Sequence, residues 1–120
     1  MRNAIKAALV AFALALASSV AAQDFDAGWE AAQRDDYVAA EREWRPLAEQ
    51  GHAVAQNNLG VMYFNGQGVA QDHVQAHMWF ALAASQGERG ATINRKRVAR
   101  LMTPEKIAEA ERLAREWKPK

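Results

Sequence analysis

Two histidines lie at a spacing that would let them bind one metal ion. His73 and His77 are four residues apart, so on a helix their imidazoles would lie one turn apart on the same face. No glutamate lies between them as in zinc proteases, and His52 is the only other histidine of the chain. Two side chains do not complete a metal site. We therefore predict no metal ligand and interpret His73 and His77 as surface or half-buried helix residues.

The residues needed for nucleophilic catalysis are also missing. The chain has no cysteine, and Ser85 is the only serine beyond the first 22 residues. A nucleophile, base and acid triad therefore has no support. We predict no catalytic residue, no cofactor and no cofactor-binding residue, and hence a protein that is not an enzyme.

The start of the chain has the pattern of a signal peptide. Two basic residues precede an apolar run from Ala7 to Ala17, and small residues then lead to Ala22. The apolar run is too short to span a bilayer, which needs about 20 residues. Without a cysteine to acylate, a lipoprotein is not expected. We expect residues 1–22 to be cleaved off after Ala22. The domain over residues 23–120 would then be periplasmic or secreted, with no stable membrane insertion.

Charge is distributed unevenly along the chain. Residues 24–87 contain nine acids and three arginines, a net charge of −6, whereas residues 88–120 contain ten bases and five acids, a net charge of +5. The basic run from Arg89 to Arg100 could contact nucleic acid, anionic lipid or an acidic protein, or could form a solvated face that offsets the acidic end. Because an exported protein rarely meets DNA, we expect no nucleic-acid partner.

Beyond the predicted signal peptide the chain favours helix. Alanine, glutamate, arginine and leucine dominate, and no β-type alternation of useful length occurs. Three short interruptions break the pattern, at residues 34–36, 65–72 and 101–104. Gly51 and Gly87 are placed to end helices in the left-handed conformation. The sequence therefore predicts an all-α domain.

Part of the sequence repeats at a fixed offset. Gly51 and Gly87 are 36 residues apart, and five further pairs share this offset, which indicates a repeat protein. Gly28 pairs with Gly60 at an offset of only 32, so the second unit has four extra residues, which residues 66–69 supply. The further pairs are Asp36 and Asp72, Ala40 and Ala76, Trp44 and Phe80, Ala48 and Ala84, and Ala55 and Ala91.

The middle unit contains two apolar stripes that would face each other in a helical hairpin. Gly60 and Ala76 are small where large residues would separate the helix axes, and Tyr63 and Phe80 fill the space beside them. Because glycine within a helix costs about 1 kcal/mol relative to alanine, we expect a packing reason for Gly60. The first stripe is Ala55, Leu59, Met62 and Tyr63, and the second is Ala76, Phe80, Ala83 and Ala84.

Turn and cap residues mark the ends of the hairpins. Gly66 and Gly68 supply positive φ, and Val69 would pack under the hairpin as an apolar plug. Asp72 caps the following helix, as Thr103 caps the last one. A hairpin of this kind cannot bury both of its faces alone, so we expect it to stack on neighbours. The expected units are residues 24–51, 52–87 and 88–118, the last of them a terminal cap with a polar outer side.

One stretch resembles the Sel1-like repeat family, a relative of the tetratricopeptide repeat with a longer glycine-bearing turn. The resemblance covers residues 52–87 well, residues 25–51 in part and the last unit loosely. It implies a right-handed α/α solenoid of about three helical hairpins, whose first helices line a concave groove. Members generally act as adaptors or scaffolds, and no catalytic residue defines the family. The signature residues are Ala55, Leu59, Gly60, Tyr63, Gly66, Gly68, Val69, Asp72, Ala76, Trp79, Phe80, Ala83, Ala84 and Gly87.

Seven side chains of the first helices lie outside the expected hairpin core and would face the groove. Aromatic rings beside amide side chains suit peptide recognition, because rings provide buried area and amides pair with an extended backbone. Alternatively, Phe25, Trp29 and Phe64 fill the seams between units of a small protein. The expected groove residues are Phe25, Trp29, Gln33, Asn57, Val61, Phe64 and Asn65.

The sequence therefore predicts an exported interaction module, a scaffold or adaptor that binds a peptide or helix of an envelope partner. Two alternatives stay open. Some relatives with many disulfides are associated with β-lactam binding, so one alternative is a weak hydrolase or metal-dependent enzyme of the envelope, although the lack of cysteine argues against it. The other is a self-associating structural protein, a homo-oligomer in which the acidic end of one copy docks on the basic end of another.

Overall fold

The described part of the chain is all-α, as predicted. The computed structural model describes residues 25–120, and the predicted signal peptide lies outside them. This range contains no strand, and none of its helices combines the length and apolar character needed to cross a membrane. Residues 25–33 are helical and are followed by α2 (Tyr37–Glu49), α3 (Ala53–Asn65), α4 (His73–Ser85), α5 (Arg89–Ala99) and α6 (Pro104–Glu116).

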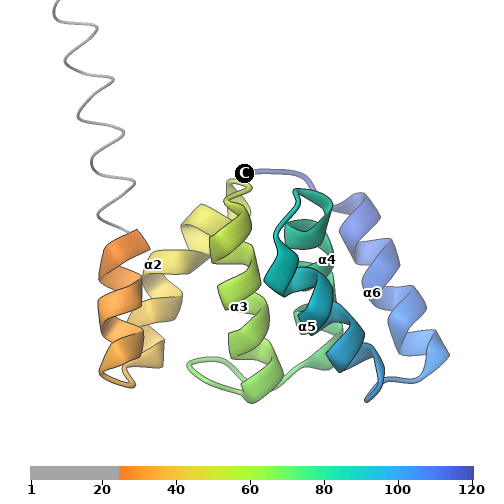
Figure 1. Ribbon diagram of the computed structural model, residues 1–120, viewed down its shortest axis with the longest axis horizontal. Coiled ribbons are helices and arrows are strands. Elements are labelled where there is room, and N and C mark those ends of the chain that lie inside the picture. The colour runs from red at the N-terminus through yellow and green to blue at the C-terminus, as the bar shows by residue number, and fades with distance from the viewer. Residues whose placement is uncertain (1–24) are drawn as a thin grey trace, which may run out of the picture.

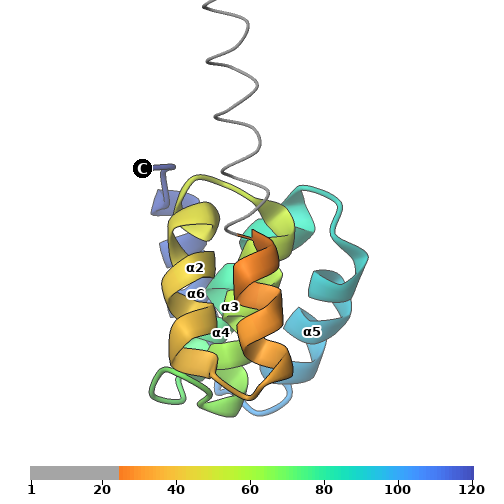
Figure 2. The same ribbon diagram turned by 90° about the vertical axis from the view of Figure 1, so that its left-hand side faces the viewer.

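The helices form a solenoid of helical hairpins (Figure 1). Residues 25–33 and α2 lie side by side as the first hairpin (Figure 2). Helix α3 packs on both α2 and α4, so the second hairpin stacks on the first. Helices α5 and α6 both pack on α4 rather than on each other. The two helices of the last hairpin therefore do not form a closely packed pair.

Two pairs of positions related by the 36-residue offset lie in the core of both hairpins. Ala40 and Ala76 have no exposed surface, and Trp44 and Phe80 are only 4% and 1% exposed. Helices α3 and α4 pack together, and most residues of the two predicted stripes are buried, which confirms the helical periodicity. Their buried members are Ala55, Leu59, Met62, Ala76, Phe80 and Ala83, whereas Tyr63 and Ala84 are half-buried.

The predicted turn and cap residues have the expected roles. Asp72 caps α4 by accepting a hydrogen bond from the backbone N–H of Gln75, and Thr103 caps α6 by accepting one from Lys106. Val69 packs against the core from the turn between α3 and α4. The glycines with positive φ are Gly51, Gly66, Gly68 and Gly87.

The C-terminal residues cross back to the first hairpin. The Trp117 ring packs edge-on against Trp79, with ring centroids 6.3 Å apart. The backbone N–H of Lys120 donates to the carbonyl oxygen of Glu49, the last residue of α2, at 2.8 Å. Figure 1 accordingly shows the C-terminus beside the loop that joins α2 to α3. This segment ties the last hairpin to the first.

Candidate functional site

Three of the expected groove residues line one recess beside α3. Trp29, Gln33 and Val61 border a hollow of about 280 Å³ between the first hairpin and α3, which we call the Trp29 recess. Trp29 is 53% exposed, so its ring forms part of the surface and not of the core. The remaining lining residues are Ala32, Tyr37, Trp44, Asn58, Met62 and Gln67.

A smaller hollow lies between α3 and α5. Val61, Phe64 and Asn65 line this space of about 100 Å³, which we call the Phe64 recess. The Phe64 ring stacks on His73, with ring centroids 5.7 Å apart, and packs against the core cluster that contains Phe80. The structure thus places five of the expected groove residues in two recesses that meet at Val61.

The other two expected groove residues make contacts within the fold. The Phe25 ring stacks on His52 at a centroid distance of 5.2 Å, and its carbonyl oxygen accepts a hydrogen bond from Trp44 Nε1 at 3.1 Å. The Oδ1 atom of Asn57 accepts a hydrogen bond from Asn94 Nδ2 at 3.1 Å. Phe25 and Asn57 therefore border neither recess, and Phe25 fills a seam.

Asn58 is a candidate binding residue that sequence reasoning missed. It lines the Trp29 recess, and its Nδ2 atom is buried without a hydrogen-bond partner among residues 25–120. Buried amide groups nearly always have a partner, so an unused donor beside a recess can serve a ligand. No pattern in the sequence signals this, because the missing partner depends on which segments fold against α3.

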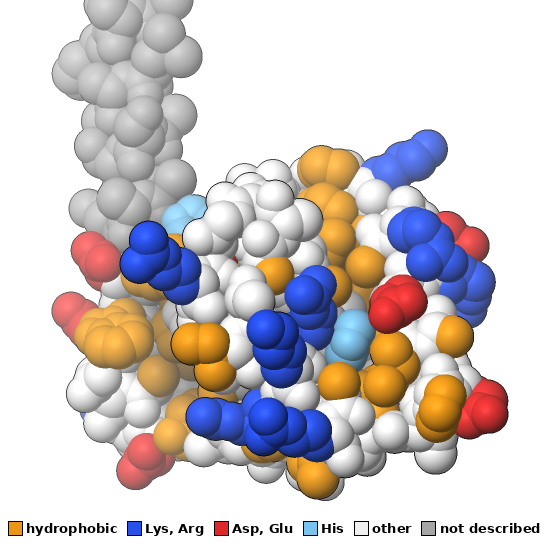
Figure 3. Space-filling model, turned by 45° about the vertical axis from the view of Figure 1, so that its right-hand side comes forward, with side chains coloured by type: hydrophobic (Ala, Val, Ile, Leu, Met, Phe, Trp, Pro, Cys, Tyr) orange, Lys and Arg blue, Asp and Glu red, His pale blue; other side chains and the backbone are white. Residues whose placement is uncertain are grey.

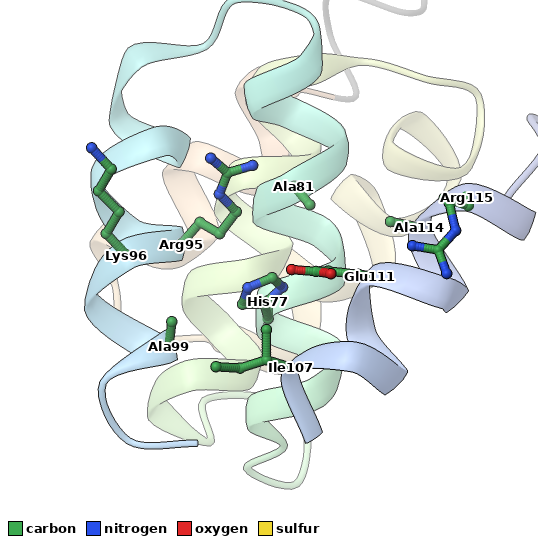
Figure 4. A pocket seen from close by; sticks show the side chains of 9 residues that line it. All are labelled: His77, Ala81, Arg95, Lys96, Ala99, Ile107, Glu111, Ala114 and Arg115. Carbon is green, nitrogen blue, oxygen red and sulfur yellow. The ribbon is translucent and has the colours of Figure 1, made fainter. Parts of the chain in front are cut away.

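A larger hollow lies between α5 and α6, a region not predicted as a site. We call it the α5–α6 groove; its volume is about 510 Å³. Helix α4 forms its floor through His77 and Ala81 (Figure 4). Figure 3 shows Lys and Arg side chains gathered on this side of the molecule. The walls are Arg95, Lys96 and Ala99 from α5, and Ile107, Glu111, Ala114 and Arg115 from α6.

His77 is buried, which corrects its interpretation as a surface or half-buried residue. It is 4% exposed because α5 and α6 pack on either side of its helix. Its Nδ1 atom is buried and has no hydrogen-bond partner within residues 25–120. Burial lowers the pKa of the imidazole, the Arg95 charge lowers it further, and Glu111 opposes both effects. The ring is therefore neutral at neutral pH.

The three histidines serve different parts of the fold. His73 stacks on Phe64, whereas His77 lines the α5–α6 groove, so the two imidazoles do not converge on one point. His52 caps α3, its Nδ1 accepting a hydrogen bond from the N–H of Ala55 at 3.1 Å. Across residues 25–120, no three His, Cys, Asp or Glu side chains cluster closely enough to hold a metal ion.

Positive charge dominates the α5–α6 groove. Arg95, Lys96 and Arg115 line it together with a single acid, Glu111. None of the four forms an ion pair with another described residue. Arg95 and Glu111 lie nearest to His77, while Lys96 and Arg115 extend at the two sides (Figure 4). Part of the predicted basic run therefore borders a groove.

Comparison with known proteins identifies the repeat. Residues 53–88, which include α3 and α4, match the family model of the Sel1 repeat. The chain also resembles a solved structure, a protective antigen present in uropathogenic Escherichia coli strains that displays an SLR (Sel1-like repeat) fold. The sequences are 31% identical with a TM-score of 0.73, and the match covers 81% of this chain and 22% of that one. The chain thus spans about a fifth of that protein's length. Comparison with curated proteins gave no match.

Proposed function

Because the chain belongs to the Sel1-like repeat family, we propose that it is a non-enzymatic protein–protein interaction module. The Trp29 recess, with the adjoining Phe64 recess, would hold a peptide segment or a helix of a partner in the cell envelope. The observation that carries this proposal is the exposed ring of Trp29 beside the unpartnered Nδ2 of Asn58.

The Trp29 recess combines apolar area with amide groups. A peptide presents a backbone N–H and a carbonyl at nearly every residue, and an amide side chain offers both a donor and an acceptor for them. Gln33, Asn58 and Gln67 bring such groups to the recess, while Trp29 and Val61 offer apolar surface. A large ring beside polar groups is typical of the residues that contribute most to binding energy.

We also propose that residues 1–22 direct export, so that the partner is met in the periplasm or outside the cell. The basic start, the apolar run and the small residues before Ala22 support this proposal. Mass spectrometry of the protein recovered from its producing cell tests it. We expect a mature chain that begins at Gln23, and an uncleaved chain in the cytoplasmic fraction would contradict export.

The Trp29→Ala variant tests the proposed binding face. Since the Trp29 ring is half exposed, its removal should leave the melting temperature nearly unchanged while weakening partner binding. The measurement is crosslinking in the cell envelope followed by affinity capture and quantitative mass spectrometry. We expect at least one captured protein to fall about tenfold, which corresponds to a loss of about 1.4 kcal/mol.

Ile93→Ala is the matched control, because Ile93 is 59% exposed on α5 and lines neither recess. It should retain every partner that Trp29→Ala loses. Phe64→Ala is less informative, since Phe64 packs against the core cluster that contains Phe80 and its removal should also destabilise the fold. Equal capture by Trp29→Ala, Ile93→Ala and the unmodified chain would overturn the assignment of the Trp29 recess.

A further inference from the structure

The α5–α6 groove exists because the last two helices diverge over α4. Both pack on α4 instead of on each other, so the floor helix stays reachable between them. The groove shares no lining residue with the Trp29 recess or the Phe64 recess. Any ligand held there would therefore use a different part of the molecule from the proposed partner-binding face.

His77 gives the floor of the groove an unused polar group. It is 4% exposed, and its Nδ1 atom lacks a hydrogen-bond partner among the described residues. Buried polar atoms without partners are rare in folded proteins, so each needs an explanation, and a bound ligand that supplies the missing bond is one. The neutral imidazole has one N–H, which can donate to a carbonyl or carboxylate oxygen that enters the groove.

The walls of the groove supply cations that are not used within the fold. Arg95, Lys96 and Arg115 form no ion pair with another residue of the range 25–120, and Glu111 is the only acid beside them. Guanidinium groups bind carboxylates through two parallel hydrogen bonds, which gives both strength and orientation. The groove therefore favours an occupant that carries carboxylates.

The same groove also offers apolar surface. Ala81 lies on the floor, and Ala99, Ile107 and Ala114 line the walls. A mixed lining of this kind suits a segment that alternates acidic and apolar side chains. Glu111 would repel a uniformly charged polyanion such as nucleic acid, because its carboxylate lies among the cations that such a ligand would need.

We propose that the α5–α6 groove is a second binding site, which takes an acidic, partly apolar peptide segment of another protein. Carboxylates of the segment pair with Arg95 and Arg115 on the opposite walls. An apolar side chain of the segment rests on Ala81 and Ile107, and the imidazole of His77 hydrogen-bonds to the segment from below.

Fluorescence anisotropy of the full chain with a labelled model peptide tests this proposal. The probe is a fluorescein-labelled peptide of about ten residues with the repeat Glu-Leu-Glu-Ala, and its counterpart with Gln in place of Glu is the neutral control. We expect the acidic probe to bind and its affinity to fall steeply as NaCl is raised to about 0.5 M. Equal binding of the neutral probe would overturn the proposal.

Charge reversal at matched positions locates the site. Arg95→Glu and Arg115→Glu should each weaken binding of the acidic probe by about tenfold or more. Arg100→Glu makes the same charge change at an exposed position outside the groove and should have a much smaller effect. If Arg100→Glu weakens binding as strongly, the attraction is a general effect of net charge and the proposal is wrong.

His77→Leu separates the floor of the groove from its walls. This variant fills the space with an apolar side chain and keeps every wall charge, so a several-fold loss of affinity would support a hydrogen bond from His77. Circular dichroism melting of each variant checks that the fold is intact. Unchanged affinity in a folded His77→Leu variant would overturn this part of the proposal.

Two further experiments would reveal a different occupant of the α5–α6 groove. Sedimentation of the full chain at low salt shows whether it forms a dimer. If Arg95→Glu abolishes the dimer and the acidic probe does not bind, the groove is occupied by a second copy of the chain. Binding of the full chain to vesicles of anionic phospholipid that Arg95→Glu abolishes, without binding of the probe, would assign the groove to a membrane surface. Trp29→Ala should leave probe binding unchanged, so the two proposed sites can fail independently.

Discussion

The ring of Phe80 covers Gly60 so closely that a Cβ atom on Gly60 would lie 2.5 Å from the ring atom Cε1. The first hairpin repeats this arrangement, since a Cβ atom on Gly28 would lie 2.6 Å from Cδ1 of Trp44. In both hairpins a glycine on the first helix therefore makes room for an aromatic ring on the second. This contact explains why glycine occurs inside two helices in spite of its low helix propensity.

Gly60→Ala should destabilise the protein. The new Cβ would overlap the Phe80 ring, and overpacking of a core typically costs about 1–3 kcal/mol, which outweighs the gain of about 1 kcal/mol in helix propensity. Urea denaturation measures the change in the free energy of unfolding. Gly90→Ala in α5 is the control, because its Cβ would meet only the flexible Glu88 and Asn57 side chains. An equal effect of both variants would contradict the packing argument.

The turn between α3 and α4 should tolerate substitution at Gly66 far better than at Gly68. Both glycines have positive φ, but a Cβ on Gly68 would also lie 2.6 Å from the carbonyl carbon of Tyr37, which is backbone and cannot move aside. Gly68→Asn should therefore cost more than about 2 kcal/mol, combining strain with a clash. Gly66→Asn should cost less than about 1 kcal/mol, because asparagine tolerates the left-handed conformation. Equal melting temperatures of the two variants would refute this difference.

Gln56 should be more important for stability than any exposed glutamine. It has no exposed surface; its Nε2 donates to the carbonyl oxygen of Ala48 at 3.1 Å, and its Oε1 accepts from Gln86 Nε2 at 2.9 Å. Gln56→Ala removes both bonds and leaves a cavity, so we expect a loss of about 2–4 kcal/mol by urea denaturation. Gln50→Ala, at an exposed position, should change stability by less than about 0.5 kcal/mol. Similar losses for both would argue against the buried network.

Acidification should destabilise the protein partly through His77. Its pKa in the folded state lies below the ordinary value of 6.5, because the imidazole is buried and lies near the charge of Arg95, while Glu111 opposes both effects. Lys96 and Arg115 line the same groove. The unfolded chain therefore binds the proton more readily. The contribution of His77 to the free energy of unfolding is therefore fully present above pH 6.5, and it is lost as the pH falls from 6.5 toward the pKa of the folded state.

Denaturation of the unmodified chain and of His77→Leu across this pH range measures the effect. The free energy of unfolding should fall less on acidification in His77→Leu than in the unmodified chain. The comparison between the two proteins removes contributions from groups other than His77. Parallel pH profiles would show that His77 is not the group responsible.

Much of the fold was predictable because it depends on residues that are close together in the chain. The stripe of Leu59 and Met62 follows helical periodicity, and the cap by Asp72 needs only the N–H three residues further on. The left-handed turn at Gly68 likewise follows from residue type. These are short-range relations, so spacing along the chain was sufficient to predict them.

The candidate sites were harder to predict, because the burial of a side chain depends on segments that are distant in the sequence. Phe25 and Trp29 lie one turn apart on the first helix, yet Phe25 stacks on His52 and Trp29 is half exposed. The sequence pattern alone did not distinguish the two rings. Asn58 was missed for the same reason, since its lack of a partner is visible only once the first hairpin is packed on α3.

The sequence by itself determined the helices, their caps, the glycine turns and the repeat, because residue type and spacing control local backbone structure. Only the tertiary structure decided that α5 and α6 diverge over α4, that His77 is buried between them and that Arg95 and Arg115 line the same groove. These features depend on how helices pack at long range, where the shapes and volumes of many side chains must fit together.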